Sequence, residues 1–342
     1  MKVLLIIPNF GNQHTLIKKA AEKIGHEIHM ISYDEKKFFK KKPILKSLAI
    51  CINYLFWISG IHAKSIATWN KINHKIFFDY ILFEKTVCEN ISSVKTKDFD
   101  AFILVKGFGF SEITINYIKK QLRPKKCILY QWDTLTHYPE VTSIYKLFDK
   151  IYTFDLVDSK KTDNTKYLPT YSTLPQDLTQ QSKSAEIAYD TVYVGEFTTY
   201  RYSLLTRLVE FFKANNISYK IHLISKNKII NKFLSQEIIS SETLSEIELK
   251  KLYEHSRVII DIAHPEQSGY TQRIYDALAI DKKILTTTQS VKHEGFFKED
   301  QIFIWDESKK SLSKNFFKTN HKKNIHTKNF PSVEQWINQV LN

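Results

Sequence analysis

The densest group of chemically useful residues lies at 261–278, where a strand-like run ends in a polar loop and a helical pattern begins. Gly269 relaxes the loop backbone, and the helix is expected to start near Thr271. The start of a helix offers unpaired N–H groups and a positive dipole, which suit a diphosphate. Arg273 and Asp276 lie three residues apart and therefore share one helix face.

A cation for phosphate and a carboxylate for ribose hydroxyls are what a nucleotide-sugar pocket requires. A helix cap with a surface ion pair is the simpler alternative for the same residues. The candidate donor-binding residues of this segment are His264, Glu266, Gln267, Ser268, Gly269, Tyr270, Thr271, Arg273 and Asp276.

A second group follows a strand-like run in the first half of the chain. Asp133 and His137 are candidate catalytic residues, and Trp132 and Tyr138 flank them. Aromatic rings stack on the C–H faces of sugars while a carboxylate accepts a hydroxyl proton, so this group suits a sugar acceptor. Asp133 could equally cap the following helix.

Glycine-bearing loops complete the acceptor-side set. Lys106, Gly107 and Gly109 follow another strand-like run, in a loop that lacks the GxGxxG spacing. Gly11 lies in the turn after the first strand. Such glycines allow close approach to a ligand, and a plain turn is the alternative.

Alternating strand and helix patterns must position these residues. Apolar, β-rich runs predict strands at 3–7, 26–31, 101–105, 127–130 and 150–154, and then at 191–194, 220–224, 258–262 and 283–287. Helical periodicity separates many of them, and a last helix is expected at 333–341. The polar stretch 174–188 divides the two series. We therefore expect an α/β protein with two Rossmann-like domains that face a cleft: 1–173, a linker at 174–188, 189–330, and a terminal helix at 331–342.

Composition excludes several other classes. Three scattered cysteines form no CxxC pair, and the chain has neither HExxH nor a tight Asp-x-Asp pair after a strand, so no disulfide framework and no metal is expected. The apolar run at the N-terminus is too short for a secretory leader, which favours the cytoplasm.

The net charge of +14 indicates an anionic partner or simply a solvated surface. Lys36, Lys37, Lys40, Lys41, Lys42 and Lys46 precede an apolar, aromatic-rich run at 48–61, which is too short to span a bilayer. This pattern favours an interfacial helix on an anionic membrane; a buried core helix is the alternative.

The 258–288 segment, which includes Lys282 and Lys283 before a Thr286-Thr287 pair, resembles the donor-binding region of GT-B glycosyltransferases. It is most similar to the lipopolysaccharide and capsule biosynthesis branch, where a HPxQxGxTxRxxEAL…KKLITT run recurs. The resemblance implies a ribose contact at Asp276, where the retaining superfamily has Glu. The upstream Glu of that family's pair falls on Ser268. It also implies that Gly195 and Arg201 approach the donor phosphates; a turn glycine and an exposed arginine are the alternative.

These observations together predict a glycosyltransferase of bacterial surface polysaccharide synthesis, peripheral at the inner face of the plasma membrane. Its partners would be a nucleotide-sugar donor, a glycan or lipid-linked acceptor and the anionic membrane, with no resident cofactor and no nucleic acid. Two alternatives remain: a basic nucleic-acid-binding protein, and a non-catalytic protein that binds sugar nucleotides.

Overall fold

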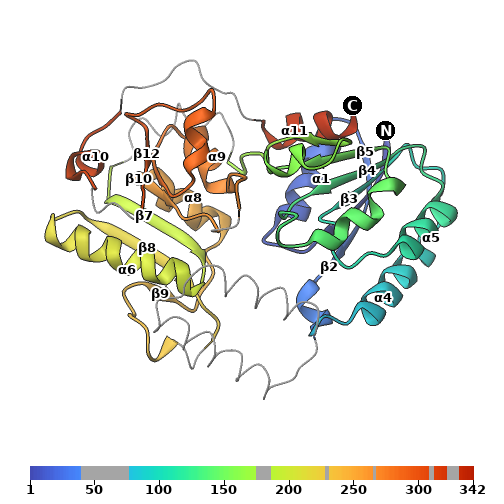
Figure 1. Ribbon diagram of the computed structural model, residues 1–342, viewed down its shortest axis with the longest axis horizontal. Helices are drawn as coiled ribbons and strands as arrows, with labels where there is room; N and C mark the ends of the chain where they lie inside the picture. The colour runs from blue at the N-terminus through green and yellow to red at the C-terminus, as the bar shows by residue number, and fades with distance from the viewer. Residues whose placement is uncertain (40–76, 175–185, 228–230, 265–266, 308–311, 322–330) are drawn as a thin grey trace. The chain divides into compact units, whose positions relative to one another are not determined.

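The chain forms two compact units, each built on a parallel six-stranded sheet (Figure 1). The computed structural model describes residues 1–39, 77–174, 186–227, 231–264, 267–307, 312–321 and 331–342. Unit 1 contains Met1–Pro169, Pro265–Gly269 and Val333–Asn342, and unit 2 contains Thr170–His264 and Tyr270–Ser332. The expected α/β class with two Rossmann-like sheets is confirmed.

The sheet of unit 1 has the strand order β2-β1-β3-β4-β5-β6. Its strands are β1 (Lys2–Pro8), β2 (Glu27–Tyr33), β3 (Ala101–Val105), β4 (Cys127–Gln131), β5 (Lys150–Thr153) and β6 (Thr165–Tyr167). Buried, continuous runs of Val, Ile, Leu and Phe form β1 and β3, as parallel strands covered on both faces require.

Helices cover both faces of this sheet (Figure 1). They are α1 (Gln13–Lys23), η1 (Glu35–Phe38), α4 (Tyr80–Ser92), α5 (Glu112–Leu122), η2 (Pro139–Leu147), η3 (Asp158–Lys160) and α11 (Val333–Leu341). On one face, α4, α5 and η2 bury apolar side chains against Leu4, Leu104 and Leu129. On the other, Trp336 of α11 lies edge-on to Tyr130. The end of the chain therefore completes the core of the first sheet.

The sheet of unit 2 has the order β12-β11-β10-β7-β8-β9. Its strands are β7 (Tyr189–Glu196), β8 (Tyr219–Ile224), β9 (Ile239–Ser240), β10 (Ser256–Asp261), β11 (Lys283–Thr286) and β12 (Ile302–Ile304). Its helices are α6 (Thr199–Ala214), α8 (Glu246–Glu254), α9 (Gln272–Ala279), η6 (Gln289–His293) and α10 (Lys314–Lys318). One core packs α6 and α10 on the sheet, and another packs α8 and α9 on its opposite face.

In each sheet, the chain places strands first on one side of the starting strand and later on the other side. In unit 1 the chain adds β2 on one side of β1 and β3 on the other; in unit 2 it adds β8 and β10 on opposite sides of β7. At such a switch point the connecting helices leave in opposite directions and open a crevice at the carboxyl ends of the strands. These two edges are where ligand-binding residues are expected.

The structure also bears on the predicted membrane segment and linker. No helix in the described part of the chain is both long and apolar enough to cross a bilayer. The run 48–61 with its preceding Lys40, Lys41, Lys42 and Lys46 lies outside the described residues, and so does most of the stretch 174–188.

Candidate functional site

The carboxyl edge of the second sheet is organised around the carboxylate of Asp261, the last residue of β10. This side chain is fully buried. Its Oδ1 accepts hydrogen bonds from Thr271 Oγ1 at 2.6 Å and Arg273 Nη1 at 3.0 Å, and its Oδ2 accepts one from Thr286 Oγ1 at 2.8 Å. A buried charge must be paired and hydrogen-bonded to be tolerated. Asp261 thereby ties together the end of β10, the end of β11 and the start of α9.

Arg273 is built into this network. Its Nε donates to the carbonyl oxygen of Val194 at 2.9 Å, its guanidinium lies 5.2 Å from the centre of the Tyr193 ring, and only 14% of the side chain is exposed. Arg273 therefore helps to hold the structure of this edge together. Its guanidinium forms both an ion pair with Asp261 and a hydrogen bond to a carbonyl oxygen of β7.

Gly195, near the end of β7, lies where Arg273 packs against the strand, and the position leaves little room for a side chain. A Cβ at this position would lie 2.5 Å from Tyr193 Oη and 3.1 Å from Arg273 Nη2, far inside normal contact distance. A side chain here would displace the tyrosine or the arginine. The glycine thus keeps β7 in close contact with the Asp261–Arg273 pair.

Arg201 lies in the first turn of α6, whose N-cap Thr198 accepts a hydrogen bond from the Arg201 backbone N–H. Its guanidinium donates to the carbonyl oxygens of Ile262 and Glu196, and it makes no ion pair with a carboxylate among the described residues. Burial lowers the pKa of Arg201, which reflects the cost of a desolvated cation. The second-sheet edge therefore carries two arginines against one buried carboxylate.

The predicted donor loop is divided between the two units. Ser268 and Gly269 belong to unit 1, where the carboxylate of Asp155 accepts hydrogen bonds from both backbone N–H groups, at 3.0 and 2.8 Å, and from Ser268 Oγ. Gln267 donates to the carbonyl oxygen of Gly269. A Cβ on Gly269 would lie 2.5 Å from the Phe154 ring, so this position requires glycine because of close packing.

Three further donor-side predictions have defined places in unit 2. Tyr270 is in the core, where its hydroxyl donates to Glu294. Thr271 is the N-cap residue of α9 and bonds Asp261. His264 is half-buried after β10, and Glu266 lies outside the described residues.

Asp276 is buried, and its carboxylate is hydrogen-bonded to other residues of unit 2. Its carboxylate accepts from the Thr173 backbone N–H at 2.7 Å, from Thr173 Oγ1 and from Ser172 Oγ. Burial raises the pKa of Asp276 to about 6, although these hydrogen bonds act in the opposite direction. Through these bonds Asp276 holds the segment that enters unit 2.

At the carboxyl edge of the first sheet, Lys106 bridges two acids. Its Nζ lies 2.8 Å from Glu35 Oε2 and 3.1 Å from Asp133 Oδ2. Burial acts to lower the pKa of Lys106, but attraction to Asp133 and Glu35 outweighs it and holds the pKa well above its ordinary value. The described contact of the Asp133 side chain is this ion pair, and the N-cap position of η2 is held by Tyr138, without a side-chain hydrogen bond. Asp133 remains 39% exposed at the edge.

The other acceptor-side predictions surround this pair. The Tyr138 ring is buried 5.1 Å from Lys106 Nζ, with the His137 ring beside it, and Trp132 is half-buried with an edge-on contact to Phe10. Gly11 has a positive φ in the open turn after β1.

Gly107 and Gly109 pack closely within their own unit. Both adopt positive φ, and a Cβ would meet Val141 at 3.0 Å for Gly107 and Phe83 at 2.9 Å for Gly109. The close approach that these glycines allow is therefore to the core of their own unit.

Sequence reasoning missed Asp261, Asp155, Tyr33 and Glu35 as organising residues. Asp261 and Asp155 have a readable signal, because each is an acid at the end of a buried apolar strand. Glu35 follows a strand in the same way, but it lies beside the lysine cluster and there resembles a surface residue.

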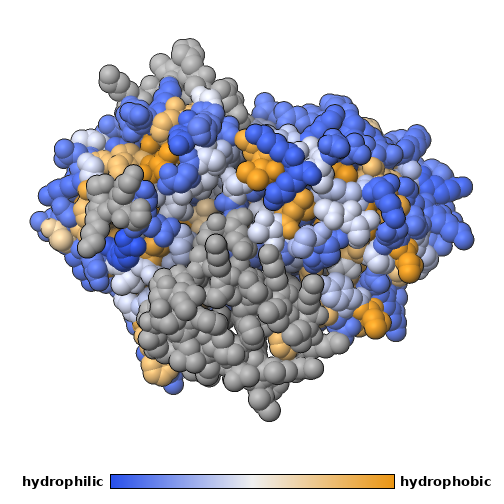
Figure 2. Space-filling model, viewed as in Figure 1, coloured by the Kyte–Doolittle hydropathy of each residue, from blue (hydrophilic) through white to orange (hydrophobic). Residues whose placement is uncertain are grey.

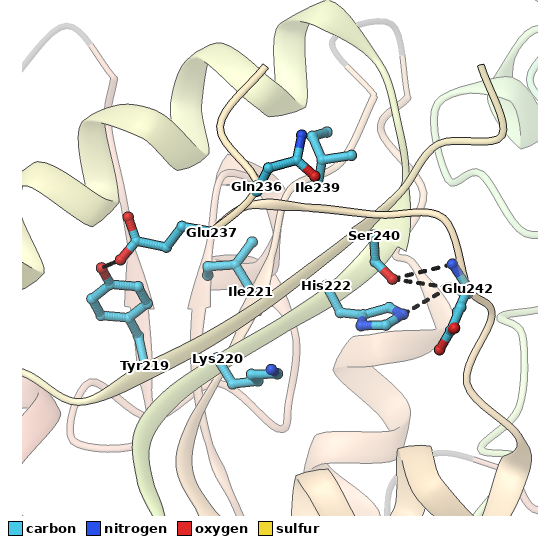
Figure 3. Close-up of a pocket in the computed structure, with 9 residues that line it drawn as sticks. All are labelled: Tyr219, Lys220, Ile221, His222, Gln236, Glu237, Ile239, Ser240 and Glu242. Atoms are coloured by element: carbon cyan, nitrogen blue, oxygen red, sulfur yellow. Dashed lines mark hydrogen bonds between the residues drawn. The ribbon is translucent and has the colours of Figure 1, made fainter. Parts of the chain in front are cut away.

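A surface hollow of about 500 Å³ lies elsewhere on unit 2, along β8 and the segment that leads to β9 (Figure 3). Tyr219, His222, Glu237 and Glu242 are among its lining residues, and His222 bonds the Glu242 carbonyl oxygen. None of the predicted site residues lines it.

No family model matches the chain, and no curated protein matches its sequence. Among solved structures, it is similar to an α,α-trehalose-phosphate synthase (UDP-forming) from Burkholderia xenovorans, with 9% identity, a TM-score of 0.49, and coverage of 83% of this chain and 85% of that one. It is also similar to Acinetobacter baumannii MurG, with 9% identity, a TM-score of 0.41, and coverage of 100% and 91%. A chain of the Glycosylation Associate Protein (Gap123) complex from Streptococcus agalactiae is 16% identical, with a TM-score of 0.37 over 71% of this chain. The present chain spans 51% of the length of that relative.

Replacing Arg273 should destabilise unit 2. In Arg273→Ala the Asp261 carboxylate keeps its burial but loses its cation, which typically costs about 3–5 kcal/mol in the free energy of unfolding. Arg201→Ala removes hydrogen bonds to carbonyl oxygens only and should cost about 1 kcal/mol. Urea unfolding of both variants measures the difference. Equal stabilities would show that the Asp261–Arg273 pair does not hold the edge together.

Proposed function

We propose that the chain is a glycosyltransferase that moves a sugar from a nucleotide-activated donor to a glycan or lipid-linked acceptor. The observation that carries this proposal is the pair of arginines at the carboxyl edge of the second sheet. Arg201 and Arg273 face one buried carboxylate there, at the switch point between β7 and β10. Crevices of this kind bind nucleotides in open α/β sheets.

The donor diphosphate fits this edge for electrostatic reasons. The guanidinium of Arg201 is desolvated and, among the described residues, bonds only carbonyl oxygens, so an anion would compensate its charge. It lies at the start of α6, a helix of 16 residues whose dipole adds positive potential. When the glycosidic bond breaks, negative charge develops on the leaving diphosphate, and positioned cations stabilise that charge. The proposal assigns this task to the arginines and requires no metal ion.

Arg201→Ala tests the donor site. It should weaken the binding of the preferred nucleoside diphosphate by about 1.5–3 kcal/mol, the value of a charged hydrogen bond. Isothermal calorimetry is the measurement, after a thermal-shift screen of nucleoside diphosphates and nucleotide sugars has selected the ligand.

Arg207→Ala is the matched control, because this arginine lies on the same helix but is more exposed and donates to the Glu307 carbonyl oxygen. Its loss should leave the affinity unchanged. If Arg201→Ala binds as tightly as the wild type, the diphosphate does not lie at the start of α6.

The acceptor is proposed to bind at the edge of the first sheet, with Asp133 as general base. Asp133→Asn should lower the rate of sugar transfer by about 10²–10⁴-fold while nucleotide affinity stays unchanged. Turnover and melting temperature are measured on the same preparation. Normal turnover would remove Asp133 from catalysis, and nucleotide binding without any turnover in the wild type would favour a non-catalytic protein.

Surface polysaccharide synthesis at an anionic membrane is the more specific part of the proposal. Its support is the lysine-rich segment that begins at Lys36 and Lys37, together with exposed apolar side chains at the starts of α4 and α5. Ile81 and Ile113 are each 82% exposed, and Glu84 of α4 accepts from the Ser111 N–H and Thr114 Oγ1 at the start of α5. On the face shown in Figure 2, the coloured apolar residues form small separate patches among polar ones.

Removal of the lysines should release the protein from anionic vesicles. Lysines near such a surface contribute about 1 kcal/mol each, so Gln at Lys36, Lys37, Lys40, Lys41 and Lys42 should abolish co-sedimentation at low salt. The control replaces five exposed lysines of unit 2: Lys213, Lys220, Lys226, Lys251 and Lys314. Equal loss in both variants would indicate a general charge effect, and a wild type that never sediments would refute membrane binding.

A further inference from the structure

Five ionisable side chains meet at the carboxyl edge of the first sheet. Tyr33 ends β2, Glu35 lies in η1, Lys106 follows β3, and Asp133 and Tyr138 follow β4. Each of Tyr33, Glu35, Lys106 and Tyr138 is electrostatically coupled to others of the group. We call Glu35, Lys106 and Asp133 the carboxylate–lysine cluster. Within the described residues it contains two acids and one cation, so its charge balance is negative.

Several buried polar atoms around this cluster lack a hydrogen-bond partner in the described structure. They are Glu35 Oε1, Tyr33 Oη and both polar side-chain atoms of Gln131. Gln131 is fully buried and Tyr33 is 6% exposed. Burying such a group without a partner costs about 1–3 kcal/mol, and native proteins rarely tolerate several together. Polar groups that need further hydrogen-bond partners therefore lie around the cluster.

The strand register places these groups on one face of the sheet. Leu129 and Leu104 pack in the same core as Tyr33, and side chains two residues apart in a strand point to the same side. Gln131 follows Leu129 at that spacing, and Lys106 follows Leu104. The β3 and β4 strands pair directly, with Val105 opposite Tyr130. Gln131, the last residue of β4, therefore lies next to the end of β3, which leads directly to Lys106.

The hydrogen-bonding character of these side chains determines which kind of ligand fits. A carboxylate oxygen accepts hydrogen bonds only, whereas the amide of Gln131 and the hydroxyl of Tyr33 can both donate and accept. Burial raises the pKa of Glu35, which shows that its charge is costly and incompletely compensated by Lys106. A ligand rich in O–H or N–H groups would satisfy this set. A phosphate or carboxylate group of a ligand would be repelled by the Glu35 and Asp133 carboxylates.

We propose that the carboxylate–lysine cluster makes the acceptor site selective for an uncharged or amino-bearing sugar over an anionic one, with Glu35 as the specificity-determining residue. This inference rests on the proposed function and adds the chemical class of the acceptor. Lys106 holds both carboxylates at the edge through its two ion pairs.

Saturation-transfer NMR with three monosaccharides of the same ring configuration, which differ in charge, tests the selectivity. The probes are glucose, glucosamine and glucuronate, each added to the full-length protein without a nucleotide. We expect glucosamine to bind at least as well as glucose and about tenfold better than glucuronate, because like charges brought together at a binding site are strongly disfavoured. Glu35→Gln preserves shape and removes the charge, and should reduce the glucosamine-to-glucuronate ratio several-fold.

Glu112→Gln is the matched control, since Glu112 lies in the same unit, is exposed and pairs with Lys146. It should leave the ratio unchanged. If Glu35→Gln does not fold, Asp133→Asn provides the same test at a more exposed member of the cluster.

Three results would overturn the inference: glucuronate binding as well as glucosamine, no saturation of any probe, or an unchanged ratio in a folded Glu35→Gln. Nucleoside diphosphate binding to the same preparation separates this inference from the donor proposal. Bound nucleotide with a preference for glucuronate refutes the acceptor class alone. A glucosamine preference without any nucleotide binding refutes the donor site alone.

Discussion

The Asp261 carboxylate is the constraint on which the second unit's edge depends. It is fully buried, and it accepts from Thr271, Arg273 and Thr286, which come from two other segments of the fold. Because a buried charge without partners is strongly unfavourable, these groups are held in one arrangement. The lack of a side chain at Gly195 follows from the same arrangement, since a Cβ there would displace Tyr193 or Arg273.

The two sheets share a topology but differ in the charge at their carboxyl edges. In unit 2, Arg273 pairs with a buried carboxylate while Arg201 bonds carbonyl oxygens, and in unit 1, one lysine joins two carboxylates. The first arrangement favours an anion, and the second favours a molecule that donates hydrogen bonds. A reaction between a nucleotide-activated sugar and a hydroxyl acceptor needs both environments. The proposed function follows from this difference in charge.

Much of the fold could be predicted because the signals are local. The continuous apolar runs that end at Val105 and Asp261 mark strands by themselves, and the alternation with helices indicates parallel sheets. The edge strands β6, β9 and β12 have only two or three residues and show no periodicity. The helix α4 did carry a signal that was not used, because Phe83, Val87 and Ile91 recur every four residues and are all buried.

The site was harder to predict because its partners are distant in sequence. The spacing of Arg273 and Asp276 correctly places both on α9. It cannot reveal that Arg273 pairs with Asp261 or that Asp276 bonds Thr173, 103 residues earlier. In the same way, Glu35 and Lys106 are 71 residues apart and meet only because β2, β1 and β3 are neighbours in the sheet. Residue types indicated the chemistry, while the topology decided which residues are free to perform it.

We propose that the donor diphosphate binds between the end of β7 and the start of α6. A crystal structure of the protein with the nucleoside diphosphate that stabilises it most is the direct test. We expect phosphate oxygens within hydrogen-bond distance of Arg201 and of backbone N–H groups in the first turn of α6. A diphosphate bound instead at the Glu35–Lys106–Asp133 edge, or in the hollow beside β8, would contradict it.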